Sequence, residues 1–193
     1  MSALPPVAPG RRGVLAAALG AALLPALPRR ANAVAAQTGV RPPDWYRTRL
    51  GDFEVTTVGD GDLDLGEPAA GFPQHPRDDL TQLLRSNFRS TDKLILPQNC
   101  FVVNTGRNMI LFDTGVGYTR PFGPNTGMLL ANLRAAGIMP EQIDAVVCSH
   151  AHIDHVWGII GGDDKPNFPK AQVFLSKADF DYWTDEQRVS AQG

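Results

Sequence analysis

Three of the four histidines in this chain lie in one six-residue segment, residues 150–155, with the sequence HAHIDH. Imidazoles packed this closely repel one another when protonated, whereas neutral imidazoles surround a divalent cation favourably. A borderline-soft ion such as Zn²⁺ accepts nitrogen and carboxylate oxygen ligands together. The segment therefore predicts a metal site, which needs a fold that presents these side chains on a rigid base. A histidine-rich surface loop is the competing interpretation.

The residues before the histidines favour the metal interpretation. Residues 143–149 (IDAVVCS) form an apolar, partly β-branched run, which predicts a buried strand. The histidines then follow the C-terminal end of that strand. Open α/β sheets place their functional residues beyond the carboxyl ends of strands. The sequence thus predicts an α/β fold with the histidine segment at the end of a strand.

The pattern H-x-H-x-D-H resembles the signature of the metallo-β-lactamase superfamily. The resemblance implies an αβ/βα sandwich that binds one or two metal ions, usually zinc, between its halves. It implies that His150 and His152 bind a first Zn²⁺ ion and that Asp154 and His155 bind a second. Asp154 would also orient the attacking hydroxide, because such ions lower the pKa of a shared water and stabilise charge on the attacked oxygen.

Further segments are similar, in the same order, to methyl parathion hydrolase and its relatives, between residues 45 and 187. They are residues 51–56 (GDFEVT), 104–106 (NTG), 111–115 (LFDTG), 122–124 (FGP) and 140–144 (PEQID). The similarity implies hydrolysis of esters, lactones or organophosphate triesters without fixing the substrate. It also implies that Phe122 and Trp183 line the substrate pocket, with ordinary core packing as the alternative.

The superfamily pattern requires two more histidines and a bridging aspartate after this segment, yet no histidine follows His155. The resemblance therefore covers only the N-terminal half of the sandwich, which leaves an apolar sheet face uncovered. A fragment of a longer hydrolase and a truncated gene product both agree with this pattern. A non-catalytic metal-binding protein is the alternative function. We expect His75, in a polar loop, to be solvated.

Three other residues have more than one interpretation. Asp113 ends a predicted strand, where it either accepts the N–H of a ligand histidine or satisfies backbone donors in a turn. Cys100 and Cys148 lie in apolar strand-like runs, which favours buried free thiols. A disulfide and metal ligation by Cys148 are the alternatives.

The first 33 residues predict an export signal. Arg11 and Arg12 precede an apolar run over residues 13–28, and residues 31–33 (ANA) supply the small side chains of a cleavage site. The paired arginines favour the twin-arginine route. A general secretory signal and an uncleaved lipid-surface segment are the alternatives. Because a spanning helix needs about 20 apolar residues, we expect a periplasmic or secreted protein with no permanent membrane anchor.

Charge and length limit the partners. Residues 1–33 hold four of the 18 basic residues and none of the 20 acidic ones, so the mature chain is acidic and has no dense basic run. That composition disfavours a nucleic-acid partner and agrees with a small-molecule, ester-type substrate. The length of 193 residues fits one domain. The sequence leaves the oligomeric state open.

The remaining pattern gives the order of elements. Residues 34–44 predict a flexible lead-in, and residues 45–193 predict one partial domain. Residues 59–62 (GDGD) are expected to form a turn, and Thr126 to cap a helix that Gly137 ends. We expect strands over residues 53–58, 99–104, 108–113 and 172–176, a helix capped by Asp78 or Asp79, and a helix over residues 178–187.

Overall fold

The computed structural model describes residues 43–191. The predicted export signal and residues 34–42 of the predicted lead-in lie outside this range, so both remain predictions. Within the range, no helix has the length and apolar character that crossing a membrane requires.

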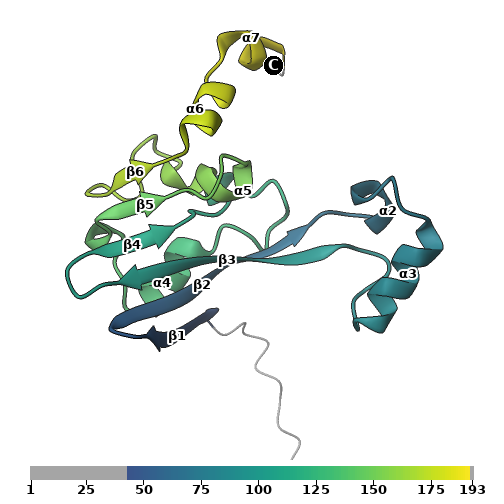
Figure 1. The fold of residues 1–193 in the computed structure, drawn as a ribbon, viewed down its shortest axis with the longest axis horizontal. Coiled ribbons are helices and arrows are strands. Elements are labelled where there is room, and N and C mark those ends of the chain that lie inside the picture. Colours follow the sequence, from purple (N-terminus) through teal and green to yellow (C-terminus); the bar gives the residue numbers. More distant parts are fainter. Residues whose placement is uncertain (1–42, 192–193) are drawn as a thin grey trace, which may run out of the picture. The chain divides into compact units, whose positions relative to one another are not determined.

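One six-stranded mixed sheet forms the centre of the described chain, and its strands lie in sequence order (Figure 1). The antiparallel part contains β1 (Trp45–Leu50), β2 (Phe53–Asp64), β3 (Ile95–Asn104) and β4 (Met109–Phe112). The parallel part adds β5 (Ala145–Val147) and β6 (Gln172–Phe174) beyond β4. Parallel neighbours need crossover connections, and the histidine segment lies in the crossover from β5 to β6.

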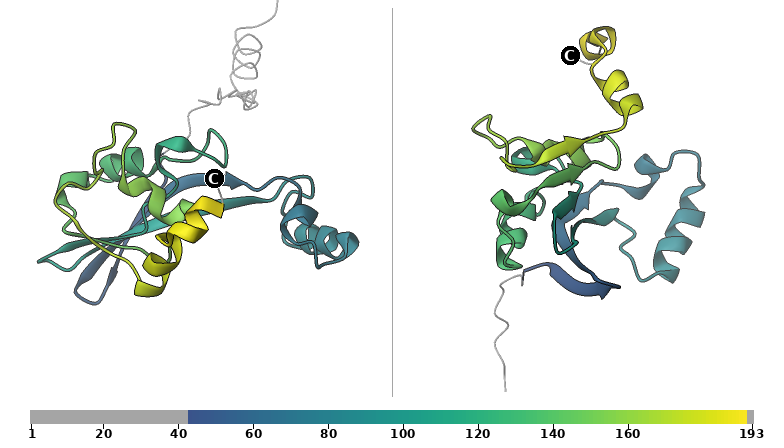
Figure 2. Two further views of the ribbon diagram at one scale, coloured as in Figure 1. Left: turned by 90° about the horizontal axis from the view of Figure 1, so that it is seen from above. Right: turned by 60° about the vertical axis from the view of Figure 1, so that its left-hand side comes forward.

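Short helices occupy the connections (Figure 2). They are α2 (Pro68–Gly71), α3 (Arg77–Ser86), η1 (Gly117–Thr119), α4 (Leu129–Ala135), η2 (Pro140–Gln142), α5 (Ile153–Val156), η3 (Trp157–Ile159), α6 (Lys177–Trp183) and α7 (Glu186–Ala191). Helices α2 and α3 form the tip of an arm that extends from the ends of β2 and β3. Helix α5 carries the second half of the histidine segment.

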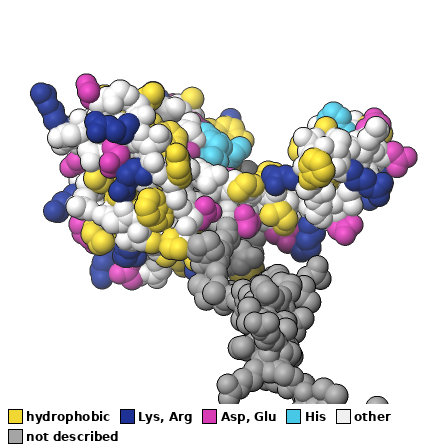
Figure 3. Space-filling view, turned by 90° about the horizontal axis from the view of Figure 1, so that it is seen from below, with side chains coloured by type: hydrophobic (Ala, Val, Ile, Leu, Met, Phe, Trp, Pro, Cys, Tyr) yellow, Lys and Arg dark blue, Asp and Glu magenta, His cyan; other side chains and the backbone are white. Residues whose placement is uncertain are grey.

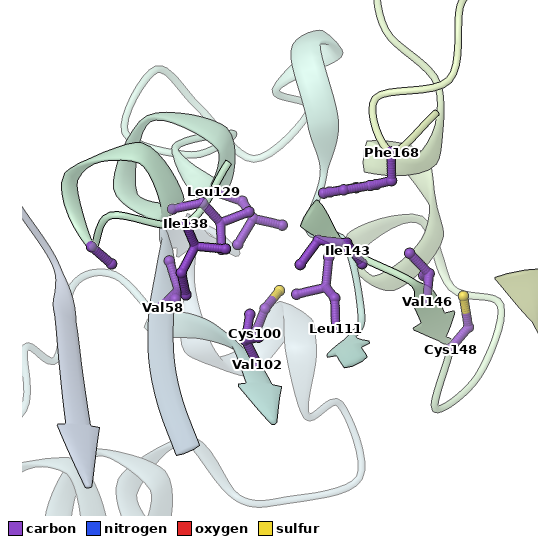
Figure 4. Close-up of a cluster of buried hydrophobic side chains, with 12 residues drawn as sticks. Val58, Cys100, Val102, Leu111, Leu129, Ile138, Ile143, Val146, Cys148 and Phe168 are labelled. Carbon is purple, nitrogen blue, oxygen red and sulfur yellow. The ribbon is translucent and has the colours of Figure 1, made fainter. Parts of the chain in front are cut away.

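The hydrophobic core lies between the sheet and α4 (Figure 4). The strands contribute alternate residues to this face, and α4 with the segment after it covers them. The cluster includes Val58, Cys100, Val102, Leu111 and Val146 from the strands, and Leu129, Leu133, Ala136, Ile138, Ile143 and Phe168 from the covering segments. This packing fixes the C-terminal ends of β4 and β5, from which the candidate site begins.

The two cysteines are free and buried, as the apolar runs around them predicted. Burial raises the pKa of the Cys100 thiol well above its usual value. Burial also raises the pKa of the Cys148 thiol, to about 11. Both side chains therefore act as small apolar groups at neutral pH rather than as thiolate ligands or nucleophiles.

The opposite face of the sheet is apolar as well. Cross-strand pairing places Phe101, Phe112, Val147 and Phe174 in one row. The rings of Phe101 and Phe112 stack with their centroids 4.5 Å apart. Phe101 is 40% exposed and Phe174 is 47% exposed. The half-sandwich expected from the sequence has an uncovered apolar face of this kind.

Residues 59–62 continue β2, so the predicted turn was wrong. The register of β2 against β3 shifts between Gly59 and Gly61, which is a β-bulge. Gly61 has a φ of +118°, and a Cβ there would overlap the carbonyl oxygen of Asn125. The glycines therefore serve a close approach between segments. The bulge buries the side chain of Asp60 completely.

Three helix boundaries also differ from the predictions. Helix α4 begins after Met128, and the Thr126 hydroxyl donates to the Gly123 carbonyl, so Thr126 is not its cap. Helix α3 begins at Arg77, which leaves Asp78 and Asp79 in its first turn. The single helix expected over residues 178–187 is divided into α6 and α7. Gly137, with a φ of +80°, ends the α4 segment as predicted.

Candidate metal centre

The histidine segment follows the C-terminal end of β5, which confirms its predicted position at a strand end. Two of its four polar residues, His150 and His152, lie in the loop before α5, and we call them the loop pair. The other two, Asp154 and His155, lie in α5, and we call them the helix pair. Figure 3 shows histidine side chains gathered at the surface of the part of the protein that contains the sheet.

Asp113 connects the neighbouring strand to the helix pair. Asp113 follows β4. The last residue of β4 pairs in parallel with the last residue of β5, so the C-terminal ends of the two strands lie side by side. Asp113 Oδ2 lies 2.9 Å from His155 Nδ1, and the side chains of His155 and Asp113 are only 20% and 13% exposed. Asp113 Oδ1 also accepts the backbone N–H of Ser149 at 2.7 Å. Asp113 thus contacts a candidate ligand histidine and also accepts a backbone N–H, as its two interpretations from the sequence require.

The hydrogen bonds around Ser149 assign the ring nitrogens. The Ser149 hydroxyl donates to Asp113 Oδ2 at 2.9 Å, so its oxygen is left to accept from His150 Nδ1 at 3.1 Å. His150 Nε2 then accepts from His152 Nδ1 at 2.9 Å. His155 Nδ1 donates to Asp113 in the same way. When each ring carries a single proton, this network leaves the Nε2 atoms of all three histidines with lone pairs.

His155 also contacts Asp154, through its other ring nitrogen. His155 Nε2 lies 3.2 Å from Asp154 Oδ2, and the Asp154 side chain is 20% exposed. With the His155 proton on Nδ1, these two atoms are both acceptors, so they face each other favourably only when a proton or a cation lies between them. A carboxylate that orients a histidine through its other nitrogen is also the usual arrangement behind a metal-binding imidazole.

The donor set fits a divalent, borderline-soft ion, because it combines three imidazoles with one carboxylate. The arrangement is not preformed: in the part of the chain that the structure describes, no three His, Cys, Asp or Glu side chains are positioned to hold a metal ion. The loop pair accounts for this, since His150 and His152 are hydrogen-bonded to each other. Their roles as ligands, like that of the helix pair, remain predictions.

Two further residues, which the sequence did not reveal, hold the backbone of the helix pair. Thr114 donates to the His155 carbonyl through both its N–H, at 2.8 Å, and its hydroxyl, at 2.9 Å. Gln98, a buried residue of β3, donates through Nε2 to the Asp154 carbonyl at 2.9 Å. Thr114 belongs to the LFDTG segment, so the sequence resemblance could have indicated it as a residue of the site. Gln98 lies in no motif.

The family of this segment follows from comparison with known proteins. Residues 95–184 match the model of the metallo-beta-lactamase superfamily. This part of the chain is therefore similar to that superfamily. The match begins with β3 and extends through the histidine segment into α6. With the six-stranded mixed sheet, it confirms the predicted α/β fold class. No curated protein matches the chain.

Solved structures agree with the superfamily assignment. AidC, a dizinc quorum-quenching lactonase, is 33% identical with a TM-score of 0.67, over 72% of this chain and 47% of that one. The hydrolase AbOPH is 30% identical with a TM-score of 0.71, over 79% and 51%. A probable metal-dependent hydrolase from Staphylococcus aureus, 19% identical with a TM-score of 0.60 over 75% and 54%, shows the fold alone. This chain spans about half the length of these structures.

The remaining candidate residues lie at different distances from the superfamily's histidine motif. The Trp183 ring meets the His152 ring edge-on, with centroids 6.2 Å apart, so the structure brings Trp183 to the site. Phe122 follows η1, and its carbonyl accepts the N–H of Asp64. No described contact joins Phe122 to the histidines, and its role in a pocket remains a prediction. His75 is exposed in the loop before α3, as expected.

Proposed function

We propose that this chain is the N-terminal half of a zinc-dependent hydrolase that cleaves esters, lactones or organophosphate triesters. The observation that carries the proposal is the position of His155 between two carboxylates, with Nε2 3.2 Å from Asp154 Oδ2 and Nδ1 2.9 Å from Asp113 Oδ2. The superfamily match and the likeness to a lactonase and a hydrolase support the reaction class. The half-length coverage of those structures supports a longer functional unit.

In this proposal the loop pair and the helix pair hold two Zn²⁺ ions, with the remaining ligands supplied by a further segment. Bound zinc supplies Lewis acidity and makes a water molecule easier to deprotonate. Asp154 accepts a hydrogen bond from the attacking water and so fixes its direction toward the substrate. Asp113 keeps the His155 proton on Nδ1, which leaves Nε2 available as a donor atom.

The substrate side of the proposal rests on Trp183. Its ring is 38% exposed and lies edge-on to His152, at the open side of the histidine segment. A large, partly exposed aromatic ring beside a reactive centre favours substrates with an apolar or aromatic group. We therefore propose an apolar ester, lactone or aryl phosphotriester as the substrate class.

A panel assay tests the proposed reaction. The zinc-loaded product of the complete reading frame is offered an acyl homoserine lactone, an aryl ester and an aryl phosphotriester. Turnover of one of these substrates, lost on zinc removal and restored by zinc addition, is the expected result. Zinc binding without turnover of any of them would support a non-catalytic metal-binding protein, which the closed contact between His150 and His152 favours.

We also propose export by the twin-arginine route, from residues 1–33 alone. Replacing Arg11 and Arg12 by lysine should leave the protein in the cytoplasm, as fractionation of the expressing cells would reveal. Replacing Arg29 and Arg30 by lysine is the matched control, because it preserves the pair that precedes the apolar run. Normal export of the Arg11→Lys, Arg12→Lys variant would contradict this route.

A further inference from the structure

The β2 bulge contains a fully buried carboxylate that joins the start of α4 to the loop after β4. Asp60 is 0% exposed. Its Oδ2 accepts the N–H of Val116 at 2.9 Å, and its Oδ1 accepts the N–H of Leu129 at 3.0 Å. Burial raises the pKa of Asp60, against the opposing effect of these backbone donors. A buried carboxyl group is costly unless its hydrogen bonds repay the desolvation, so its partners indicate its purpose.

One of those partners, Val116, belongs to the segment that supports the candidate metal centre, and the other, Leu129, is the first residue of α4. Val116 and Gly115 follow Asp113 and Thr114 directly in the chain. Gly115 has a φ of +69°, and a Cβ there would overlap the Asp60 carboxylate. The loop therefore lies directly against this side chain. Two residues before Gly115 stands the carboxylate that holds the His155 ring.

The loop is buried, but one side of it borders open space. A cavity of about 220 Å³ borders it, with Asp60, Thr114 and Gly117 among the residues that line it. A loop beside a cavity has room to shift, because the atoms that face the cavity lack contacts on that side. Hydrogen bonds hold the loop beside this cavity: Val116 donates to Asp60, and the Gly115 carbonyl accepts the N–H of Gly158.

We propose that Asp60 is a positioning residue for the metal centre. By accepting the N–H of Val116 and lying against Gly115, it fixes Asp113 and Thr114, and these two residues fix the ring and the carbonyl of His155. The proposal rests on the proposed function for the role of His155 as a ligand. Asp60 itself touches neither the histidines nor a substrate in this account.

The substitution Asp60→Asn tests this relation. The two N–H groups reach different oxygens of the carboxylate, so in an amide the NH₂ group would face one of them and that hydrogen bond would be lost. Thr126→Val is the control, since Thr126 is equally buried and loses one hydrogen bond, from its hydroxyl to the Gly123 carbonyl rather than to Asp60 or Val116. Val116→Pro is a second test variant. Val116 has a φ of −79°, close to that of proline, so this change removes the N–H with little backbone strain.

Two measurements are made on the full chain. Long-range ¹H–¹⁵N spectra of the zinc-free protein report which nitrogen of His155 carries the proton, and a Zn²⁺ titration gives the metal affinity. In the wild type His155 should be protonated on Nδ1. In Asp60→Asn and Val116→Pro this preference should weaken, and zinc affinity should fall about tenfold, the effect of losing support behind a ligand. Thr126→Val should leave both readouts unchanged.

Unchanged His155 signals and zinc affinity in a folded Asp60→Asn would overturn the proposal, and so would equal changes in Thr126→Val. If Asp60→Asn does not fold, Val116→Pro decides by the same two readouts. The spectra need no turnover. A protein that hydrolyses no ester but shows the expected His155 change would refute the proposed function and retain the positioning role of Asp60.

Discussion

The helix pair and the loop pair are separated by a single residue, yet the protein supports them very differently. Asp154 and His155 are held by contacts from one other strand, through Gln98 of β3, and from the loop after β4, through Asp113 and Thr114. His150 and His152 bond to each other, and His152 is exposed. Neighbouring residues of one motif therefore differ in how much they must rearrange to bind a cation.

This difference has an energetic consequence. A ligand that already points in the required direction loses little conformational entropy on binding, whereas an exposed side chain must be ordered first. The loop pair must also give up the hydrogen bond between its two rings. We therefore expect the helix pair to contribute most to zinc binding by this chain. The loop pair should bind zinc tightly only when the further ligands of a complete site are present.

The largest expected effect is on the reaction itself. Asp154→Ala removes both a helix-pair ligand and the group that directs the attacking water, so hydrolysis by the complete, zinc-loaded protein should fall by several powers of ten. Steady-state rates over an ester panel measure this. Asp163→Ala is the control, since Asp163 is an exposed acid that pairs with Lys165. Near-normal turnover of Asp154→Ala with metal bound would leave the metal a structural or redox role.

Asp113→Asn tests the residue that supports the helix pair by contacting His155. The amide no longer accepts from Ser149 and His155 together as a carboxylate does, so zinc affinity should fall about 10 to 100-fold. Asp144→Asn is a suitable control, because Asp144 also accepts a backbone N–H, from Met109, at the other end of the paired strands. A competition titration with a chelator gives both affinities. Equal losses in the two variants would show a general effect on the sheet.

The strand and motif pattern predicted the position of the histidine segment, because a short apolar run followed by polar residues depends only on local sequence. The supports of the helix pair depend on which strands become neighbours. Gln98 is adjacent to Asp154 only after β3, β4 and β5 have paired. Asp60 was read as part of a turn because GDGD is turn-like locally, whereas its buried contacts come from distant residues.

Trp183→Ala should affect activity less than the two substitutions above, because Trp183 contacts the loop pair, through His152. Loss of the ring that faces His152 should change the preference between aryl and aliphatic substrates by about tenfold, with a smaller change in the common rate. Phe180→Ala is the control, since Phe180 lies on the same helix and is 57% exposed. The ratio of kcat/KM values for paired substrates is the measurement. An equal change for both substrates would remove Trp183 from the pocket.

A zinc titration followed through the side-chain nitrogens of all four histidines tests the central claim most directly. His75 provides the internal control, because it lies in the exposed loop before α3. The account predicts that His155 responds at the lowest zinc concentration, that His150 and His152 respond later, and that His75 does not respond specifically. A response of His75 equal to that of His155, or no response of His155, would contradict a metal centre at this segment.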